Sequence, residues 1–321
     1  MKTILVSGAS GIVGYGILRS LRRSGKSLRL VGTTIYDDSA AQGFCDIFER
    51  APTTSDTGYL EWLCRIISTH QVDLIFPGIE ADMYRWIESV GALEESGPVK
   101  AVLNNPRLIS LCKDKWTFFE TLSSSGLGCV IETTLESDFD ALAGKFGLPF
   151  LLKPRMGFGS KCIVRVDSPA TFLEHRAQIG PVLMAQPIMG TENEEFTTSA
   201  FCDGTGGFHA HMTLKRKLSS DGFTDRAEVV EVDDIAGAVR DLCGLFRPIG
   251  PTNFQFRRHQ GALKLLEINP RVSSSTSIRT AFGYNESAMA VEYYLEGKTP
   301  RQPVIRPGRA VRYVEDFVFY S

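Results

Sequence analysis

The 321-residue sequence lacks a surplus of charge of either sign. It has 35 basic and 37 acidic side chains, which gives a formal net charge of -2. Proteins that bind nucleic acid or an acidic membrane through their overall electrostatic field carry a clear excess of positive charge. We therefore expect neither nucleic acid nor a membrane surface as a partner.

Long apolar runs are also missing. No stretch approaches the roughly 18 apolar residues that a membrane-spanning helix needs. The opening run MKTILVS contains one Lys and ends at Gly8, so it lacks the apolar core of a signal peptide. We expect a cytoplasmic protein, whose hydrophobic content of 43% is that of an ordinary globular fold.

Paired cysteines and clustered histidines are absent as well. The seven cysteines occur singly, without a CxxC motif, at Cys45, Cys64, Cys112, Cys129, Cys162, Cys202 and Cys243. This pattern favours reduced thiols in the core over a disulfide framework or a zinc site. His209 and His211 would share one face of a strand, but no third ligand lies near them in sequence.

Alternating strand and helix patterns are present in the first hundred residues. We predict strands at residues 2–7, 28–33 and 74–77. We also predict one helix that ends near Arg23 and a second helix that spans 59–70. Such alternation is typical of an α/β unit with a parallel sheet and right-handed crossovers. This first part of the chain should therefore form a doubly wound, Rossmann-like domain.

Two features of this half have a functional and a structural explanation. The glycines of Gly8 to Gly14 could bind a dinucleotide phosphate or only permit a tight turn. With Asp37 near the next strand end, the first explanation would suggest an NAD(P)-dependent reductase. Glu80 and Asp82 follow the strand at 74–77, where they could face an amine substrate or simply cap a helix.

A glycine loop between two β-rich runs is the first informative feature of the second half. It contains Gly157, Gly159 and Ser160 and follows Lys153. Backbone amides of such a loop can cover phosphates while the lysine neutralises them. A hairpin with an exposed basic turn is the structural alternative. Before it we predict a helix from residue 106 through Lys115 to about 123.

A hairpin at residues 252–277 carries oxygen ligands on one face. We predict strands at 253–258 and 262–268, followed by a loop rich in Ser and Thr. Glu267 and Asn269 are two residues apart and share a face with Gln255. Their carboxylate and amide oxygens suit Mg²⁺, with Mn²⁺ as a substitute. Arg271 would bind phosphate. A hairpin with a wet polar face is the alternative. The basic run at 215–217 is expected to be a solvated face.

In this order, these motifs resemble the ATP-grasp superfamily, and within it a single module of the carbamoyl-phosphate synthetase large-chain type. The segment EINPRVSSSTS carries most of the resemblance, which covers about residues 104–298. It implies a Rossmann-like pre-ATP-grasp domain at 1–103, a linker helix with the phosphate flap at 104–186, and a C-terminal subdomain with the metal site at 187–321. The last two would clasp ATP as α+β subdomains.

The resemblance also implies roles for individual residues. Arg271 and Lys153 would act on the transferring phosphoryl group, and the magnesium ligands would be Gln255, Glu267 and Asn269. The nucleotide would be held by Lys115, Lys153, Gly157, Gly159, Ser160, Gln186, Pro187, Ile188 and Glu195. Weaker candidates for substrate contacts are Glu80, Asp82, Arg226, Ser273 and Arg279.

The implied activity is ATP- and Mg²⁺-dependent ligation of a small carboxylate, such as an amino acid, to an amine through an acyl phosphate. The products would be an amide or peptide, ADP and phosphate. One module without an allosteric tail argues against synthesis of carbamoyl phosphate. An ATP-binding sensor without turnover is the alternative. The apolar tail at 310–320 could pair at the edge of a homodimer or close the core.

Overall fold

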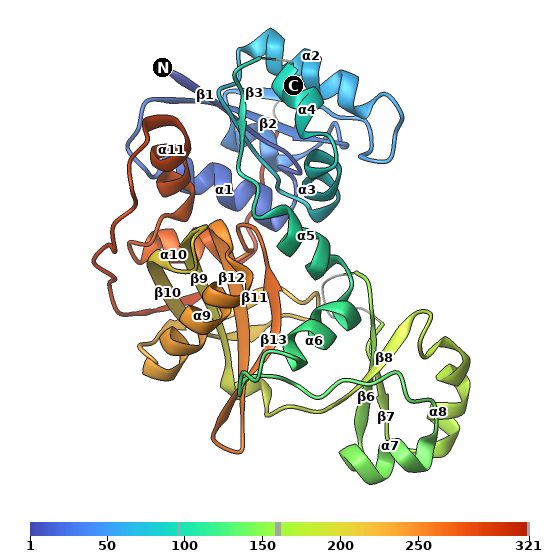
Figure 1. Ribbon diagram of the computed structural model, residues 1–321. Helices are drawn as coiled ribbons and strands as arrows, with labels where there is room; N and C mark the ends of the chain where they lie inside the picture. The colour runs from blue at the N-terminus through green and yellow to red at the C-terminus, as the bar shows by residue number, and fades with distance from the viewer. Residues whose placement is uncertain (96, 158–161, 320–321) are drawn as a thin grey trace.

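The computed structural model describes residues 1–95, 97–157 and 162–319. Figure 1 shows three packed parts, each built on its own sheet. Gly159 and Ser160 of the expected flap lie outside the described residues. None of the helices within the described ranges has the length and apolar character needed to cross a lipid bilayer.

The N-terminal part is a parallel sheet in the order β3-β2-β1-β4-β5. Its strands are β1 (Lys2–Val6), β2 (Leu28–Thr34), β3 (Ile47–Arg50), β4 (Leu74–Phe76) and β5 (Lys100–Ala101). Its helices are α1 (Ile12–Arg22), α2 (Tyr59–His70), α3 (Glu80–Ile87) and α4 (Val90–Glu95), with a 3-10 turn at Ala40–Phe44. The doubly wound prediction is confirmed, and α2 has the bounds that the sequence predicted.

The second part is a small lobe built on a three-stranded sheet in the order β7-β6-β8. It consists of α7 (Phe139–Phe146), β6 (Phe150–Pro154), β7 (Val164–Val166), α8 (Pro169–His175), a 3-10 turn (Arg176–Gln178) and β8 (Leu183–Pro187). Phe150 and Phe172 are buried in a core that belongs to this lobe alone. Because Phe150 and Leu152 point into that core, Lys153 on the same strand points to the other face.

The third part is an antiparallel sheet in the order β13-β12-β9-β10-β11-β14. Its strands are β9 (Glu195–Asp203), β10 (Phe208–Leu218), β11 (Thr224–Val229), β12 (Ile249–His259), β13 (Ala262–Asn269) and β14 (Arg309–Val311). Its helices are α9 (Asp233–Phe246), α10 (Thr276–Ala281) and α11 (Glu286–Glu296), with a 3-10 turn at Glu192–Glu194. The predicted Ser/Thr loop therefore ends earlier than expected, where α10 begins.

Helices α5 (Pro106–Lys113) and α6 (Lys115–Ser123) pack on this third sheet rather than in the small lobe. We predicted one continuous helix here, and that prediction is wrong. Asp114 has extended backbone dihedrals, and its carboxylate caps α6 by accepting a hydrogen bond from the Trp116 amide at 2.9 Å. The break leaves Lys115 in the first turn of a new helix.

The six-stranded sheet uses one of its faces for two purposes. At one end, Phe201, Met212 and Leu214 share a core with α1, α10 and α11. Two residues beyond Leu214 on β10, the same face carries Arg216. Along a single strand, the side chains on this face therefore change from apolar core residues to polar residues of the candidate site.

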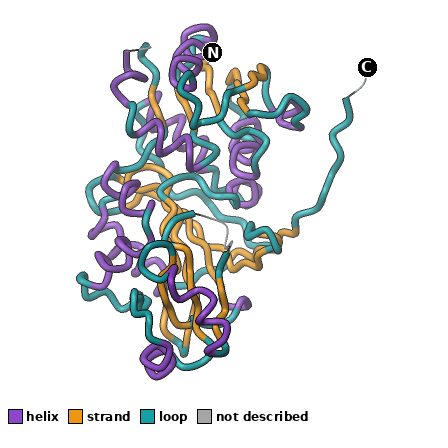
Figure 2. The backbone as a smooth tube through the Cα atoms, turned by 90° about the vertical axis from the view of Figure 1, so that its right-hand side faces the viewer, coloured by secondary structure: helices purple, strands orange, loops and turns teal. Residues whose placement is uncertain are grey.

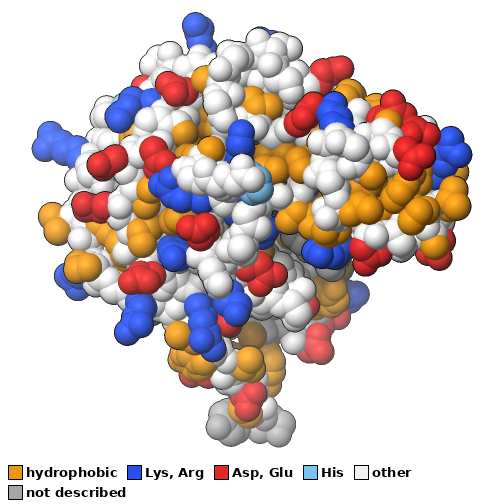
Figure 3. Space-filling view, turned by 90° about the horizontal axis from the view of Figure 1, so that it is seen from below, with side chains coloured by type: hydrophobic (Ala, Val, Ile, Leu, Met, Phe, Trp, Pro, Cys, Tyr) orange, Lys and Arg blue, Asp and Glu red, His pale blue; other side chains and the backbone are white. Residues whose placement is uncertain are grey.

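The C-terminal tail pairs with β11 over its first residues only. Residues 309–311 pair with β11 inside this chain. Beyond them the described residues 312–319 form no helix or strand, and Figure 2 shows them as an extended loop. Arg312 donates to the Thr224 carbonyl at 2.6 Å, and the Phe317 ring lies against Gly43 of the N-terminal part. The face presented in Figure 3 has basic and acidic side chains interspersed, as the small net charge suggests.

The glycines after β1 have a packing role. A Cβ atom on Gly14 would overlap the carbonyl oxygen of Gly8, and one on Gly78 would overlap that of Ser7. These contacts bring α1 and the end of β4 directly onto the backbone after β1. Gly14 and Gly78 therefore have a packing role, which is compatible with both explanations of the glycine pattern.

We expect Gly14→Ala to lower the free energy of unfolding by about 2 kcal/mol or more, because the clash is with backbone atoms that cannot turn aside. Gly144→Ala is the matched control, since this exposed helical glycine has open space around it and should gain up to about 1 kcal/mol. Urea denaturation measures both. Equal stability of the two variants would contradict the packing role.

Candidate functional site

The β12–β13 hairpin brings the predicted magnesium ligands together. Gln255 is directly opposite Glu267, and Asn253 is opposite Asn269. Gln255 Nε2 lies 2.5 Å from Glu267 Oε1, and Asn269 Nδ2 donates to the same oxygen at 2.9 Å. Both amides therefore converge on one carboxylate, on the face of the sheet that looks away from the α5–α6 core.

A bulge in β13 makes this convergence possible. Phe256 pairs with Leu265 and Gln255 with Glu267, so Leu266 is an extra residue in β13. Leu265 and Ile268 are both buried in the core below the sheet. Without the extra residue, strand alternation would put Leu265 and Glu267 on the same face.

Two arginines that sequence reasoning missed complete this face. Arg216 Nη2 lies 2.8 Å from Glu195 Oε1 and 2.5 Å from Gln255 Oε1. Arg257 Nη2 lies 2.7 Å from Glu195 Oε2. Arg216 is 6% exposed, so the expectation of a solvated basic face at 215–217 is wrong for this residue.

A sequence signal for both arginines did exist. Arg216 continues the alternation of the buried Met212 and Leu214 along β10. Arg257 is two residues after Gln255 on β12, and therefore lies on the same face. Alternation along a strand would have separated Arg216 from its neighbours Lys215 and Lys217.

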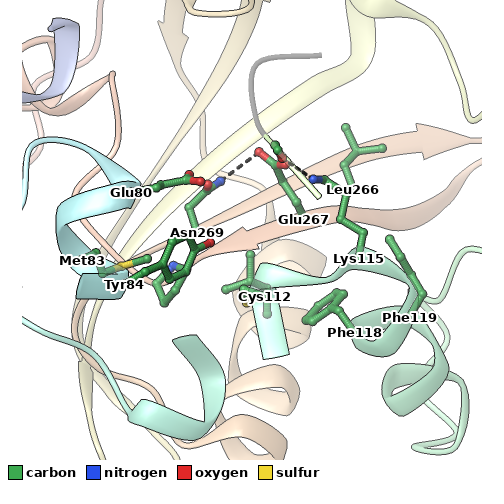
Figure 4. Close-up of a pocket in the computed structure, with 13 residues that line it drawn as sticks. Glu80, Met83, Tyr84, Cys112, Lys115, Phe118, Phe119, Leu266, Glu267 and Asn269 are labelled. Carbon is green, nitrogen blue, oxygen red and sulfur yellow. Dashed lines mark hydrogen bonds between the residues drawn. The ribbon is translucent and has the colours of Figure 1, made fainter. Parts of the chain in front are cut away.

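The predicted lysines approach the hairpin from two other elements. Lys115 Nζ lies 2.5 Å from the carbonyl oxygen of Gly157, which joins α6 to the edge of the expected flap. Figure 4 shows Lys115 and Glu267 on the rim of one pocket, with Asn269 and Glu80 further along it. The floor of this pocket is apolar and includes Cys112, Phe118 and Phe119.

Lys153 has an unusual protonation equilibrium. Burial lowers its pKa to about 8; the positive charges of Arg257 and Lys115 act in the same direction, while the Glu267 and Glu195 carboxylates oppose them. A lysine with such a pKa changes charge in the physiological range. It can bind an anionic phosphate as an ammonium and take up a proton when it does so.

Arg271 connects the hairpin to the N-terminal part. Its Nη2 atom lies 2.5 Å from Glu80 Oε1 and 3.3 Å from Asn269 Oδ1. Glu80 is the first residue of α3. Hydrogen bonds thus join the side chains from Glu195 through the hairpin to Glu80 into one connected set. Lys115 lines the same pocket as Glu267, and the Glu267 and Glu195 carboxylates influence the pKa of Lys153, so we count both lysines with the site. The charged members of the site are five cations and three carboxylates: Lys115, Lys153, Arg216, Arg257, Arg271, Glu80, Glu195 and Glu267.

The predicted nucleotide contacts Gln186, Pro187 and Ile188 lie at the end of β8 and directly after it. Gln186 is fully buried, and its Nε2 donates to Thr133 Oγ1 at 2.6 Å. Its Oε1 is a buried acceptor without a donor among the described residues. Pro187 and Ile188 follow it with partly exposed side chains.

Among the described residues, no hydrogen bond joins four of the weaker substrate candidates directly to the charged side chains of the site. Asp82 is buried and accepts hydrogen bonds from Thr54 and Tyr59. Arg226 is exposed on β11, with Asp225 3.6 Å away. Arg279 is fully buried and donates to Ser273 Oγ at 2.7 Å, so both residues belong to the interior beneath the site.

The donor set fits a magnesium ion that is shared with phosphates. Mg²⁺ is commonly held by one or two carboxylates, with water and phosphate oxygens completing its octahedron. Glu267 supplies a carboxylate, and Gln255 and Asn269 would supply amide oxygens once they rotate, because their NH₂ groups face Glu267 in this structure. Within the described ranges, no group of three or more His, Cys, Asp or Glu side chains could hold a metal alone.

Comparisons with known proteins show which families this chain is similar to. A family model described as "ATP-grasp in the biosynthetic pathway with Ter operon" matches residues 181–317. The carbamoyl phosphate synthase large chain of Thermomicrobium roseum is 25% identical over 224 residues, which cover 61% of this chain and 20% of that one. Its counterpart in Thermotoga petrophila is 23% identical over 348 residues, covering 93% and 31%. The chain therefore spans less than a third of these relatives.

Solved structures with low sequence identity have the same fold. N5-carboxyaminoimidazole synthetase from Staphylococcus aureus is 18% identical, with a TM-score of 0.73, over 95% of this chain and 80% of that one. The biotin carboxylase domain of 2-oxoglutarate carboxylase from Hydrogenobacter thermophilus is 15% identical, with a TM-score of 0.72, over 96% and 73%. These similarities confirm the predicted fold class.

We expect Arg216→Met to lower the free energy of unfolding by about 3 kcal/mol, because Glu195 is 3% exposed and would lose one of its two cationic partners. Lys217→Met removes the same charge from the neighbouring exposed position and should change stability by less than about 0.5 kcal/mol. Urea unfolding of both variants tests this. A similar cost for each would show that Arg216 has no special structural role.

The pKa of Lys153 predicts a pH dependence for binding of ATP, the ligand implied by the resemblance. Lys153 is charged below a pH of about 8 and neutral above it, so affinity is present at low pH and lost as the pH rises. Between pH 7 and pH 9 the dissociation constant should rise about tenfold if binding requires the ammonium form. Lys153→Arg stays charged and should vary less than about twofold. Calorimetry at both pH values is the measurement, and a parallel change in both proteins would contradict it.

Proposed function

Because the chain belongs to the ATP-grasp superfamily, we propose that it is an ATP- and Mg²⁺-dependent ligase. It would activate a small carboxylate as an acyl phosphate and join it to an amine, with release of ADP and phosphate. An amino acid is our candidate for the carboxylate. The observation that carries the proposal is the pairing of Gln255, Glu267 and Asn269 within a ring of lysines and arginines.

The charge of the site supports a polyanionic ligand. Its five cations exceed its three carboxylates, so the protein alone leaves an excess of positive charge in a partly buried cleft. A triphosphate with Mg²⁺ offsets this excess. Preorganised cations of this kind stabilise the charge that develops on a transferring phosphoryl group.

The carboxylate of Glu267 is the proposed main ligand of the metal. In this structure each amide presents its NH₂ group to Glu267 and its oxygen to an arginine. Binding of Mg²⁺ to the carboxylate would therefore require both amides to rotate, so that their oxygens turn from the arginines to the metal. The metal would supply charge stabilisation to the phosphates, while Lys153 and Arg271 of this chain orient them.

The buried acceptor of Gln186 supports adenine at the end of β8. Gln186 Oε1 lacks a donor among the described residues, and the amino group of adenine can supply one. Glu195 is held by Arg216 and Arg257, so we propose that it positions these arginines as well as any ribose. The flap residues Gly157, Gly159 and Ser160 keep their proposed role of covering the phosphates.

The proposed partners are small molecules, a carboxylate and an amine. A homodimer is a further proposal; the Hydrogenobacter thermophilus structure is described as a biotin carboxylase domain dimer in complex with MgADP. The likeness of residues 181–317 to an ATP-grasp family model favours the ligase over the NAD(P)-dependent reductase that the glycine pattern suggested.

We expect Glu267→Gln to abolish Mg²⁺-dependent ADP release, with a loss of at least about 100-fold, because the variant removes the carboxylate to which both amides donate. Glu228→Gln, an exposed carboxylate on β11, should retain full activity. ADP and phosphate release with pairs of amino acids and amines is the assay. Unchanged ATP binding and turnover in Glu267→Gln would overturn the site assignment, and tight ATP binding without turnover across the panel would favour a sensor.

A further inference from the structure

The ion pair between Arg271 and Glu80 joins two parts of the fold within the site. Arg271 follows β13 in the C-terminal sheet, and Glu80 begins α3 of the N-terminal part. Their nearest atoms are 2.5 Å apart, and the two side chains are only 14% and 16% exposed. In this arrangement, the guanidinium proposed to face phosphate is engaged by a carboxylate.

The ion pair with Glu80 reduces the number of Arg271 N–H groups that are available to an anion. Arg271 Nη2 binds Glu80 and Asn269, and Nη1 donates to the Val272 carbonyl at 3.0 Å. Shielding from water strengthens the attraction between the paired charges. A phosphate must therefore compete with Glu80 for this guanidinium, unless another cation occupies Glu80.

The surroundings of Glu80 indicate which cation would fit. Glu80 lines the same pocket as Met83, Tyr84, Cys112 and Phe118, so a carboxylate lies beside an apolar hollow. Figure 4 shows Glu80 near the rim, with Met83, Tyr84 and Cys112 below it. A positively charged nitrogen on an apolar body matches this combination, since its charge meets Glu80 while its carbon atoms leave water.

We propose that Glu80 docks a positively charged nitrogen of the acceptor substrate, and that this docking frees Arg271 for phosphate. The proposal rests on the proposed ligase function and adds a substrate class and a coupling between substrates. Because such coupling is reciprocal, the cation should tighten nucleotide binding as much as the nucleotide tightens binding of the cation. ATP would then be cleaved mainly when an acceptor is present.

The test compares the wild type with Glu80→Gln and Glu88→Gln. Glu88 follows α3, and its exposed carboxylate makes only a 3.7 Å ion pair with Lys113, which makes it the matched control. MgATP affinity is measured by calorimetry in sodium chloride and in n-butylammonium chloride at equal ionic strength. ADP release is followed under the same conditions.

We expect butylammonium to tighten MgATP binding to the wild type and to Glu88→Gln roughly fivefold or more, in the range typical of coupled sites. Methylammonium, which has no apolar body, should act more weakly. Glu80→Gln should bind MgATP more tightly in sodium chloride, show higher basal ADP release, and no longer respond to butylammonium.

The Arg271→Ala background separates this coupling from a general charge effect. There, Glu80→Gln should no longer tighten nucleotide binding, because the guanidinium through which it acts is gone. An unchanged effect of Glu80→Gln in that background, or an equal butylammonium response in the wild type and Glu80→Gln, would overturn the proposal. Failure of the wild type to bind MgATP at all would instead overturn the proposed function.

Discussion

The register of the β12–β13 hairpin is the constraint on which the site depends. Phe254 and Phe256 must reach the core below the sheet, and their partners Ile268 and Leu265 must follow them. These two partners are three residues apart, an odd spacing that a regular strand cannot place on one face. The extra residue Leu266 resolves this conflict and turns Glu267 toward Gln255.

Hydrophobic packing thus fixes a polar geometry. The energy that holds Glu267 in place comes from the apolar residues on either side of it, since burial of each large side chain contributes roughly 1.5–3 kcal/mol. The same relation holds on β10, where Met212 and Leu214 are buried in the core and Arg216 is carried to the site. The polar groups can then be selected for chemistry, because they do not have to determine the fold.

Local patterns predicted much of this arrangement. Alternation along β13 put Glu267 and Asn269 on one face, and the bounds of α2 followed from its apolar spacing. The sequence did not predict the break at Asp114, because a single acidic residue within a helical pattern is usually solvated rather than a cap. It did separate Arg216 from its basic neighbours through alternation with Met212 and Leu214 on β10, although a run of three cations is usually solvated.

Longer-range features depended on tertiary packing. The sequence put α5 and α6 with the flap, whereas the apolar residues Leu108, Phe118 and Leu122 share the core of the six-stranded sheet. The link between Arg271 and Glu80 joins residues 191 positions apart, and no periodicity connects them. Contacts of this kind follow from how the sheets pack and not from local sequence.

The separate core of the small lobe has a consequence for the dynamics of the protein. Its buried residues, among them Leu142, Phe150 and Phe172, contact one another and not the cores of the other two parts. Such a unit can open and close without unfolding its neighbours, so amide protons in β6 and β7 should exchange with solvent through a sub-global opening of lower free energy. The lobe that carries Lys153 is therefore the part of the molecule best suited to move first when the proposed nucleotide enters or leaves.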